Sequence, residues 1–180
     1  MKKGLNNLKV IAALAILAAL SIVLGKYLAI PVGDVMRFSL ESMPIIFAGM
    51  AFGPAAGMAV GIVADMIGCV MVGYTVNPVV TAGAAAIGLM SGAVPLLLKK
   101  VKIHNILISI ITVASAHLIG SVLIKTLGLA VYYDMPFFIL MLWRILNYAV
   151  VGIIDGTAVH ILINNKGIQM QLKSIGGERK

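Results

Sequence analysis

The chain of 180 residues is 61% hydrophobic and 11% charged, and its mean hydropathy is +1.09. A soluble domain has about 45–50% apolar and about 25% charged residues, so these charges are too few to cover a water-soluble surface. The formal net charge is +8, but the basic residues stand between and beyond the apolar blocks, without interleaved aromatic residues or a recognition motif. The composition argues against a nucleic-acid partner and predicts an all-α integral membrane protein in a lipid bilayer.

Apolar blocks follow one another along the chain, most of them close to the about 20 residues that a helix needs to cross a bilayer. Proline and glycine separate several of them, since proline disfavours helix in the residue before it. The second block is short for an upright crossing, so we expect it to be buried among the others. The pattern predicts one domain with a bundle of six transmembrane helices over residues 8–30, 38–52, 54–73, 78–98, 103–131 and 137–164, followed by a basic cytoplasmic tail over residues 165–180.

The first block carries small residues on one face. Ala12, Ala15 and Ala19 are spaced at i, i+3 and i+7, which places them together on a helix. Such a flat patch suits packing inside this bundle or against a separate membrane subunit, and the spacing alone slightly favours packing inside.

Glycines recur every four residues in the second, third and fourth blocks, and this spacing lets helix backbones approach closely. We interpret them as packing residues within the bundle, and Gly53 also suits a turn with Pro54. The residues are Gly49, Gly53, Gly57 and Gly61, then Ala84, Gly88 and Gly92.

Positive residues set the orientation of membrane helices, because segments rich in Lys and Arg resist translocation. With six spans, Arg37 is the main basic residue on one side, and both chain termini are predicted to be cytoplasmic. The basic residues on the other, cytoplasmic side are Lys2, Lys3, Lys9, Lys99, Lys100, Lys102, Lys166, Lys173, Arg179 and Lys180.

Motifs of known catalytic chemistry are missing from the sequence. There is no phosphate-binding G-x-x-x-x-G-K-[ST] loop, no H-E-x-x-H and no G-x-S-x-G. The three histidines are scattered, and Cys69 is the single cysteine, so no metal-ligand cluster is expected. We therefore expect no enzyme, no metal and no cofactor, with any ATP used by other subunits.

Charged residues near the predicted non-cytoplasmic ends of the helices indicate a binding pocket, because a buried charge needs water, a partner or a function. Arg37, Glu41, Lys125 and Arg144 map to one depth. For Lys125, as for Lys26, we favour a side chain that reaches the lipid headgroups. Arg144 lies about two turns inside the last helix, and its guanidinium fork suits a ligand carboxylate.

Aromatic and amide side chains gather on the same predicted side, and two interpretations stay open for them. They could form a belt at the lipid interface, or a cleft in which a flat heterocycle stacks on rings. His117 could line that cleft or be a hydrogen-bonded packing residue. Asp65 and Asp155 are expected to hydrogen-bond neighbouring helices, Asp155 towards the cytoplasm. The candidate substrate-binding residues are Arg37, Glu41, Tyr74, Asn77, His117, Trp143, Arg144, Asn147 and Tyr148.

Several motifs in this order resemble the substrate-binding S component of an energy-coupling factor (ECF) vitamin transporter, in its folate-type branch. The resemblance covers nearly the whole chain. Its motifs are the alanine-rich first helix, Arg37-Phe38-Ser39-Leu40-Glu41, Ala48-Gly49-Met50-Ala51-Phe52-Gly53-Pro54, the residues Gly57, Gly61, Asp65 and Gly68, the stretch Gly73-Tyr74-Thr75-Val76-Asn77-Pro78, and Trp143-Arg144.

The resemblance implies a six-helix subunit in the prokaryotic plasma membrane that captures a vitamin from outside, with folate or a reduced folate as the leading ligand. It also implies partners: a transmembrane coupling protein and two ATPase subunits, with the first-helix alanines facing the coupling protein. Alternatives are an S component for another vitamin or precursor, such as a pyrimidine precursor, pantothenate or queuosine, and a scaffold subunit that transports nothing.

Overall fold

The computed structural model describes residues 7–32, 36–101 and 103–175, except for the side chains of Val32, Met36, Arg37 and Tyr133. Its elements are helix α1 (Leu8–Ile22), π-helical turn η1 (Val23–Tyr27), strands β1 (Ile30–Val32) and β2 (Met36–Phe38), helices α2 (Ser42–Phe52), α3 (Pro54–Met71), α4 (Pro78–Leu98) and α5 (Asn105–Ala116), π-helix η2 (His117–Ile124), and helices α6 (Lys125–Tyr133), α7 (Phe137–Asn164) and α8 (Lys166–Ile175).

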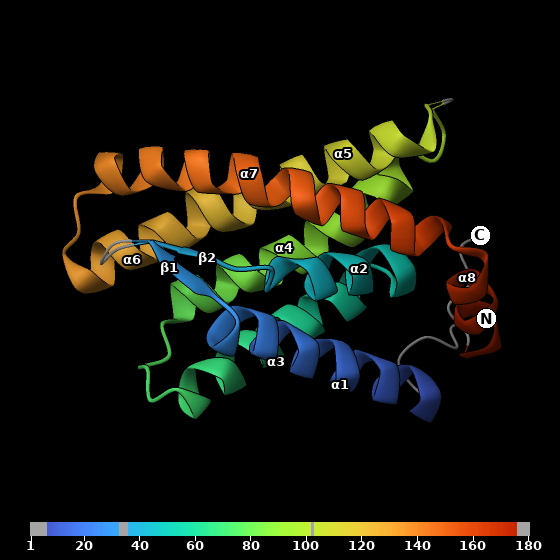
Figure 1. The fold of residues 1–180 in the computed structure, drawn as a ribbon, viewed down its shortest axis with the longest axis horizontal. Coiled ribbons are helices and arrows are strands. Elements are labelled where there is room, and N and C mark those ends of the chain that lie inside the picture. The colour runs from blue at the N-terminus through green and yellow to red at the C-terminus, as the bar shows by residue number, and fades with distance from the viewer. Residues whose placement is uncertain (1–6, 33–35, 102, 176–180) are drawn as a thin grey trace.

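The long helices run side by side along the long axis of the molecule (Figure 1). The β1–β2 hairpin points to the same end as the turn between α6 and α7, which we call the hairpin end. Helix α8 lies across the opposite end, the α8 end, where Asn7 Nδ2 donates a hydrogen bond of 3.0 Å to the carbonyl of Ile175. The start of α1 and the last described helix therefore meet at one end of the bundle.

Five helical stretches in the described part of the chain are long and apolar enough to cross a membrane. They are Leu8–Tyr27, Pro54–Met71, Pro78–Leu98, Asn105–Tyr132 and Phe137–Asn164. Helix α2 has 11 residues, which gives it a length of about 16 Å, roughly half of the hydrocarbon core. The predicted count of six spanning helices is thus not confirmed.

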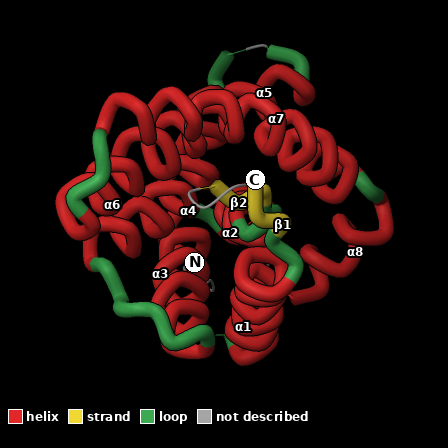
Figure 2. The backbone as a smooth tube through the Cα atoms, turned by 60° about the vertical axis from the view of Figure 1, so that its left-hand side comes forward, coloured by secondary structure: helices red, strands yellow, loops and turns green. Residues whose placement is uncertain are grey.

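Helix α2 occupies the middle of the bundle, where longer helices surround it (Figure 2). Its apolar residues point in all directions, as expected for a helix that is buried on every side. Ile45, Ile46 and Ala48 are at most 2% exposed. The expectation that the second apolar block is buried among the others agrees with this arrangement.

Glycines let α2, α3 and α4 pack backbone to backbone. A Cβ atom added at Gly49 would stand 2.6 Å from the carbonyl oxygen of Gly88, and one added at Gly88 would collide with the backbone of Gly57. Gly92 fits against Pro54 in the same way. These contacts confirm the interpretation as packing residues for Gly49, Gly57, Gly88 and Gly92, whereas Gly53 has a φ of +98° and nothing within 4 Å of an added Cβ, which agrees with a turn before Pro54.

Two predicted helix ends are strands in the structure. Residues 30 and 38 were expected in helices, but Ile30 pairs with Phe38 in an antiparallel hairpin that also pairs Pro31 with Arg37. Proline lacks a backbone N–H and cannot continue a helix, and the flanking β-branched residues favour extended backbone. The first helix accordingly ends at the π-helical turn η1.

Candidate ligand-binding site

A buried ion pair joins the start of α2 to the start of α6. Lys125 Nζ lies 2.6 Å from Glu41 Oε1, and the lysine side chain is 5% exposed while the glutamate side chain is 23% exposed. The expectation that Lys125 reaches the lipid headgroups is therefore wrong. An ammonium group in this apolar interior needs an anionic neighbour, and Glu41 supplies it.

Glycines make room for the charged side chains. A Cβ atom at Gly83 of α4 would stand 2.5 Å from Lys125 Cγ, and one at Gly25 would stand 2.6 Å from Glu41 Cβ. These two residues come from different parts of the chain, yet each contacts one member of the ion pair. The inward direction of both side chains is therefore built into the helix packing.

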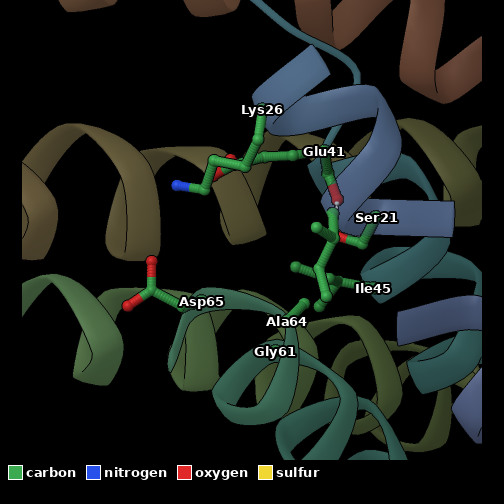
Figure 3. A pocket seen from close by; sticks show the side chains of 9 residues that line it. Ser21, Lys26, Glu41, Ile45, Gly61, Ala64 and Asp65 are labelled. Carbon is green, nitrogen blue, oxygen red and sulfur yellow. Dashed lines mark hydrogen bonds between the residues drawn. The ribbon is translucent and has the colours of Figure 1, made fainter. Parts of the chain in front are cut away.

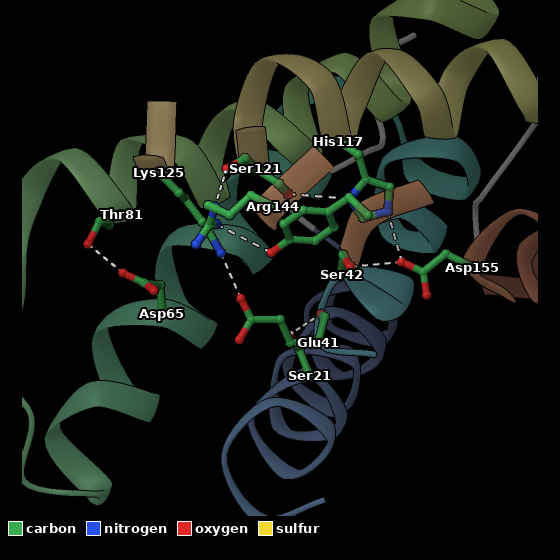
Figure 4. A network of polar contacts seen from close by, with 11 residues as sticks. Ser21, Glu41, Ser42, Asp65, Thr81, His117, Ser121, Lys125, Arg144 and Asp155 are labelled. Carbon is green, nitrogen blue, oxygen red and sulfur yellow. Dashed lines mark hydrogen bonds and ion pairs between the residues drawn. The ribbon is translucent and has the colours of Figure 1, made fainter. Parts of the chain in front are cut away.

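Arg144 points into the bundle from α7 (Figure 4). Its Nε donates a hydrogen bond of 3.0 Å to the carbonyl of Ser121, and its Nη2 donates one of 3.4 Å to the Tyr148 hydroxyl. The guanidinium also lies 5.4 Å from the centre of the Tyr148 ring. All these hydrogen-bond partners are neutral, and Glu41, the described carboxylate that also feels the charge of Arg144, is paired with Lys125.

His117 and Asp155 extend the polar network deeper between η2, α7 and α2. His117 Nε2 lies 3.1 Å from Asp155 Oδ2, which also accepts a hydrogen bond of 2.7 Å from Ser42 Oγ. The His117 ring stacks on Tyr148 with its centre 4.8 Å away. Asp155 is 0% exposed and joins neighbouring helices, as expected, and it lies in the half of α7 nearer the α8 end.

Lys26 and Asp65 face each other across a small cavity (Figure 3). A Cβ atom at Gly68 would stand 2.9 Å from Lys26 Cε, so this lysine stem also lies against a glycine. Asp65 Oδ2 accepts a hydrogen bond of 2.6 Å from Thr81 Oγ1, which confirms that it bonds a neighbouring helix. The cavity holds about 10 Å³ and is lined by Ser21, Ile22, Lys26, Glu41, Ile45, Gly61, Ala64, Asp65 and Ala84.

Five charged side chains therefore converge between the helices, and we call them the charged cluster: Lys26, Glu41, Asp65, Lys125 and Arg144. Two of the predicted site residues, Glu41 and Arg144, belong to it, while His117 and Tyr148 adjoin it through the stacked rings. Asn147 is buried on α7, one residue before Tyr148.

Other predicted site residues lie elsewhere. Asn77 caps α4 by accepting hydrogen bonds from Val79 N and Val80 N, and its Nδ2 donates one to the carbonyl of Gly128. Tyr74 follows α3 and is 49% exposed, and Trp143 is 51% exposed on α7. Arg37 lies in β2, and its side chain is outside the described part of the structure. The role of these residues as ligand contacts stays a prediction.

Sequence reasoning missed the inward positions of Lys26 and Lys125 and the place of Ser121 in the network. A signal for two of them was present, because His117, Ser121 and Lys125 recur every four residues and so share one helix face. A polar stripe of this kind in an apolar span indicates an inward-facing surface.

The alanines of the first helix lie on the surface of the bundle. Ala12, Ala15 and Ala19 are exposed, whereas Leu14 and Ala18 on the other face of α1 are buried. The interpretation as packing inside this bundle is therefore wrong, and contact with a separate membrane subunit stays a prediction.

Comparison with known proteins identifies the family. The family model described as "ECF transporter, substrate-specific component" matches residues 9–163. The chain belongs to this family. The resemblance seen in the sequence is thus confirmed, and this substrate-specific component belongs to a family of membrane transporter subunits rather than of enzymes. A search among curated proteins found no match.

Solved structures share the fold of this substrate-specific component. The structure of FolT bound with folic acid has a TM-score of 0.69 and 22% identity, covering 86% of this chain and 92% of that chain. The S component for biotin from an ECF-type ABC transporter has a TM-score of 0.66 and 17% identity, covering 89% and 93%. The S component of a bacterial ECF transporter has a TM-score of 0.53 and 16% identity, covering 92% and 94%. At these identities the likeness establishes the fold alone.

Proposed function

We propose that this substrate-specific component captures folate or a reduced folate from outside the cell for uptake driven by partner subunits. The observation that carries the proposal is the inward direction of Arg144, whose hydrogen-bond partners are the neutral oxygens of Ser121 and Tyr148. A guanidinium in an apolar bundle favours an anionic ligand, and its fork matches a carboxylate. Folate carries two carboxylates on its glutamate tail.

The charge balance of the charged cluster supports an acidic ligand. Lys26, Lys125 and Arg144 contribute three positive charges, and Glu41 and Asp65 contribute two negative charges, which leaves a net charge of +1 among these five residues, with Asp155 outside them and held by His117 and Ser42. In a medium of low dielectric constant this excess favours an anion over a neutral ligand.

Rings beside the charged cluster support a ligand that also has a flat heterocycle. Tyr148 and His117 already form a stacked pair on the inward side of the bundle, next to Arg144. Aromatic faces bind flat conjugated ligands by offset stacking. The pterin ring of folate fits this requirement, and the fold shared with FolT bound with folic acid agrees with it.

Partner subunits would supply the energy, since the sequence has no P-loop. We propose that the exposed face of Ala12, Ala15 and Ala19 contacts the transmembrane coupling protein, which joins two ATPases, in the plasma membrane of a prokaryotic cell. Small residues permit close approach between helices of different subunits.

The test is ligand binding to the purified full chain in detergent, measured by calorimetry with folate, 5-formyltetrahydrofolate, biotin, pantothenate and a pyrimidine precursor. We expect folate or the reduced folate to bind with low-micromolar or tighter affinity without ATP. Arg144→Gln should raise the Kd at least about thirtyfold, the effect of losing about 2 kcal/mol from a buried charged contact.

The matched control is Lys99→Gln, because Lys99 is an exposed cation at the α8 end. It should leave the folate Kd unchanged. Binding of a different vitamin instead of folate would assign another substrate. A folded, monodisperse protein that binds none of the panel would contradict the proposal and favour the scaffold alternative.

A further inference from the structure

We propose that Glu41 is an internal competitor for the acid group of the ligand: its carboxylate occupies Lys125 until a ligand carboxylate replaces it. This inference rests on the proposed capture of an acidic vitamin and adds which residue competes with the ligand acid for its cation. Its basis is the 2.6 Å ion pair between Glu41 and Lys125, beside the inward-facing Arg144 (Figure 4).

The two members of the pair differ in exposure. Each lies against a glycine, Lys125 against Gly83 and Glu41 against Gly25, but the Lys125 side chain is 5% exposed whereas the Glu41 side chain is 23% exposed. A ligand that enters the cluster therefore meets the carboxylate before the ammonium. The carboxylate is the partner that can leave, and the lysine is the fixed cation.

The backbone at Glu41 is anchored, so the exchange needs only a side-chain movement. The Glu41 carbonyl accepts a hydrogen bond of 2.6 Å from Ser21 Oγ, and the neighbouring Ser42 donates to Asp155. Helix α2 can thus keep its position between α1 and α7 while the Glu41 side chain rotates away from Lys125.

Space and charge both oppose simple addition of a ligand acid to the existing pair. The cavity that Glu41 lines holds about 10 Å³, which is room for about one water molecule. A carboxylate bound to Arg144 would also lie beside the Glu41 carboxylate, and two like charges repel strongly in an apolar interior. Replacement removes both conflicts, because one anion takes the place of another.

Replacement also explains selectivity. A neutral ligand cannot displace Glu41, since this would leave the buried Lys125 ammonium without a counter-ion. An acidic ligand supplies the counter-ion itself. Lys125 therefore discriminates between an acid and its neutral analogue, while Glu41 lowers the affinity for the acid by competing with it.

The test compares folate with its neutral dimethyl ester on the full chain in detergent. Glu41→Gln keeps the shape of the side chain and removes the competing charge. We expect it to lower the Kd for folate about tenfold and to leave the Kd for the ester unchanged. Adding Lys125→Gln to Glu41→Gln should abolish the gain for folate, because the cation that the ligand acid binds is then lost.

A second variant covers the case in which Glu41→Gln does not fold. Glu41→Asp keeps the charge but shortens the reach to Lys125, so it should lower the folate Kd by a smaller factor. Weaker binding of folate and ester alike by these variants would show that Glu41 contacts the ligand directly, and an unchanged folate Kd would show that it does not compete. Either result overturns the inference while the proposed function stands, whereas a wild-type protein that binds no folate rejects both.

Discussion

Asp155 has a carboxylate with no solvent exposure in the middle of an apolar helix bundle. Desolvation of such a group is costly, so its hydrogen bonds must offset the cost. His117 and Ser42 supply them, and they belong to η2 and α2. At the scale of single residues, this contact ties the central helix to two others and supports the His117–Tyr148 stack beside the charged cluster.

Replacing Asp155 tests that role. Asp155→Ala leaves the Ser42 hydroxyl and His117 Nε2 without this acceptor, and we expect the free energy of unfolding to fall by about 1–3 kcal/mol. The buried thiol of Cys69, 8% exposed, provides the measurement, because a thiol-reactive dye labels it when the protein unfolds on heating.

The control for that experiment is Asn164→Ala, which removes an exposed side chain that bonds His160. Its melting temperature should match that of the wild type. If Asp155→Ala melts at the same temperature as the wild type and Asn164→Ala, the stabilising role of the network is contradicted.

Some site residues could be predicted from the sequence because a charge within an apolar span needs a function. Arg144 was found in this way, and the structure directs it inward. Lys125 was misplaced because its distance from a helix end suggested contact with headgroups. The glycine that makes room for it, Gly83, is remote in sequence, and no local pattern reports such a contact between helices.

Helices α2, α3 and α4 form the tightest unit at the scale of elements, and one substitution tests it. Gly88→Ala places a Cβ atom against the backbone of Gly57, which cannot yield as a flexible side chain can. We expect a loss of about 3 kcal/mol or failure to fold, consistent with overpacking of a close helix contact. The loss of stability is measured by the labelling of Cys69 with the thiol-reactive dye on heating.

Gly156→Ala in α7 is the matched control, since the nearest atom to an added Cβ there is Val113 Cγ2 at 4.0 Å. Alanine favours helix over glycine by up to about 1 kcal/mol, so this variant should be as stable as the wild type or slightly more stable. Equal melting temperatures for both variants would contradict the close-packing argument.

The long helix predicted over residues 103–131 contains the π-helix η2 in the structure. Apart from His117 and Ser121 its residues stay apolar through the change, so the hydrophobic pattern does not mark where the π-helix begins. Segments of π-helix occur frequently at functional sites, and η2 provides both His117 and the carbonyl that accepts from Arg144. The β1–β2 hairpin was missed because its outer pair, Ile30 and Phe38, is apolar and adjoins the two predicted helices.

The fold class of the whole molecule followed from composition, because an apolar chain with few charges has few alternatives to a helical membrane bundle. The number of spanning helices did not follow, since apolar length cannot distinguish a crossing helix from the short α2 enclosed by others. Basic residues support one orientation: Lys9, Lys99, Lys166 and Lys173 all lie in the described part near the α8 end.

Cysteine labelling tests this orientation in cells. In a Cys69→Ala background, Ser174→Cys marks α8 and Asp134→Cys marks the turn before α7, and both positions are exposed. A membrane-impermeant maleimide should label position 134 in intact cells and position 174 only in inverted vesicles. Labelling of position 174 in intact cells would contradict the predicted cytoplasmic termini.

In helix α7, 17% of an apolar stretch of 18 residues is buried inside the bundle, against 33–44% in the other four candidate spans. It nevertheless carries Arg144 and Tyr148, while the glycine contacts that fix the bundle lie in α2, α3 and α4. The closest backbone contacts therefore lie outside the helix that supplies Arg144 and Tyr148. Substitutions at these two positions should change the preferred ligand without loosening the glycine contacts, which makes them a natural starting point for re-engineering uptake, while Lys125 and Glu41 stay in place.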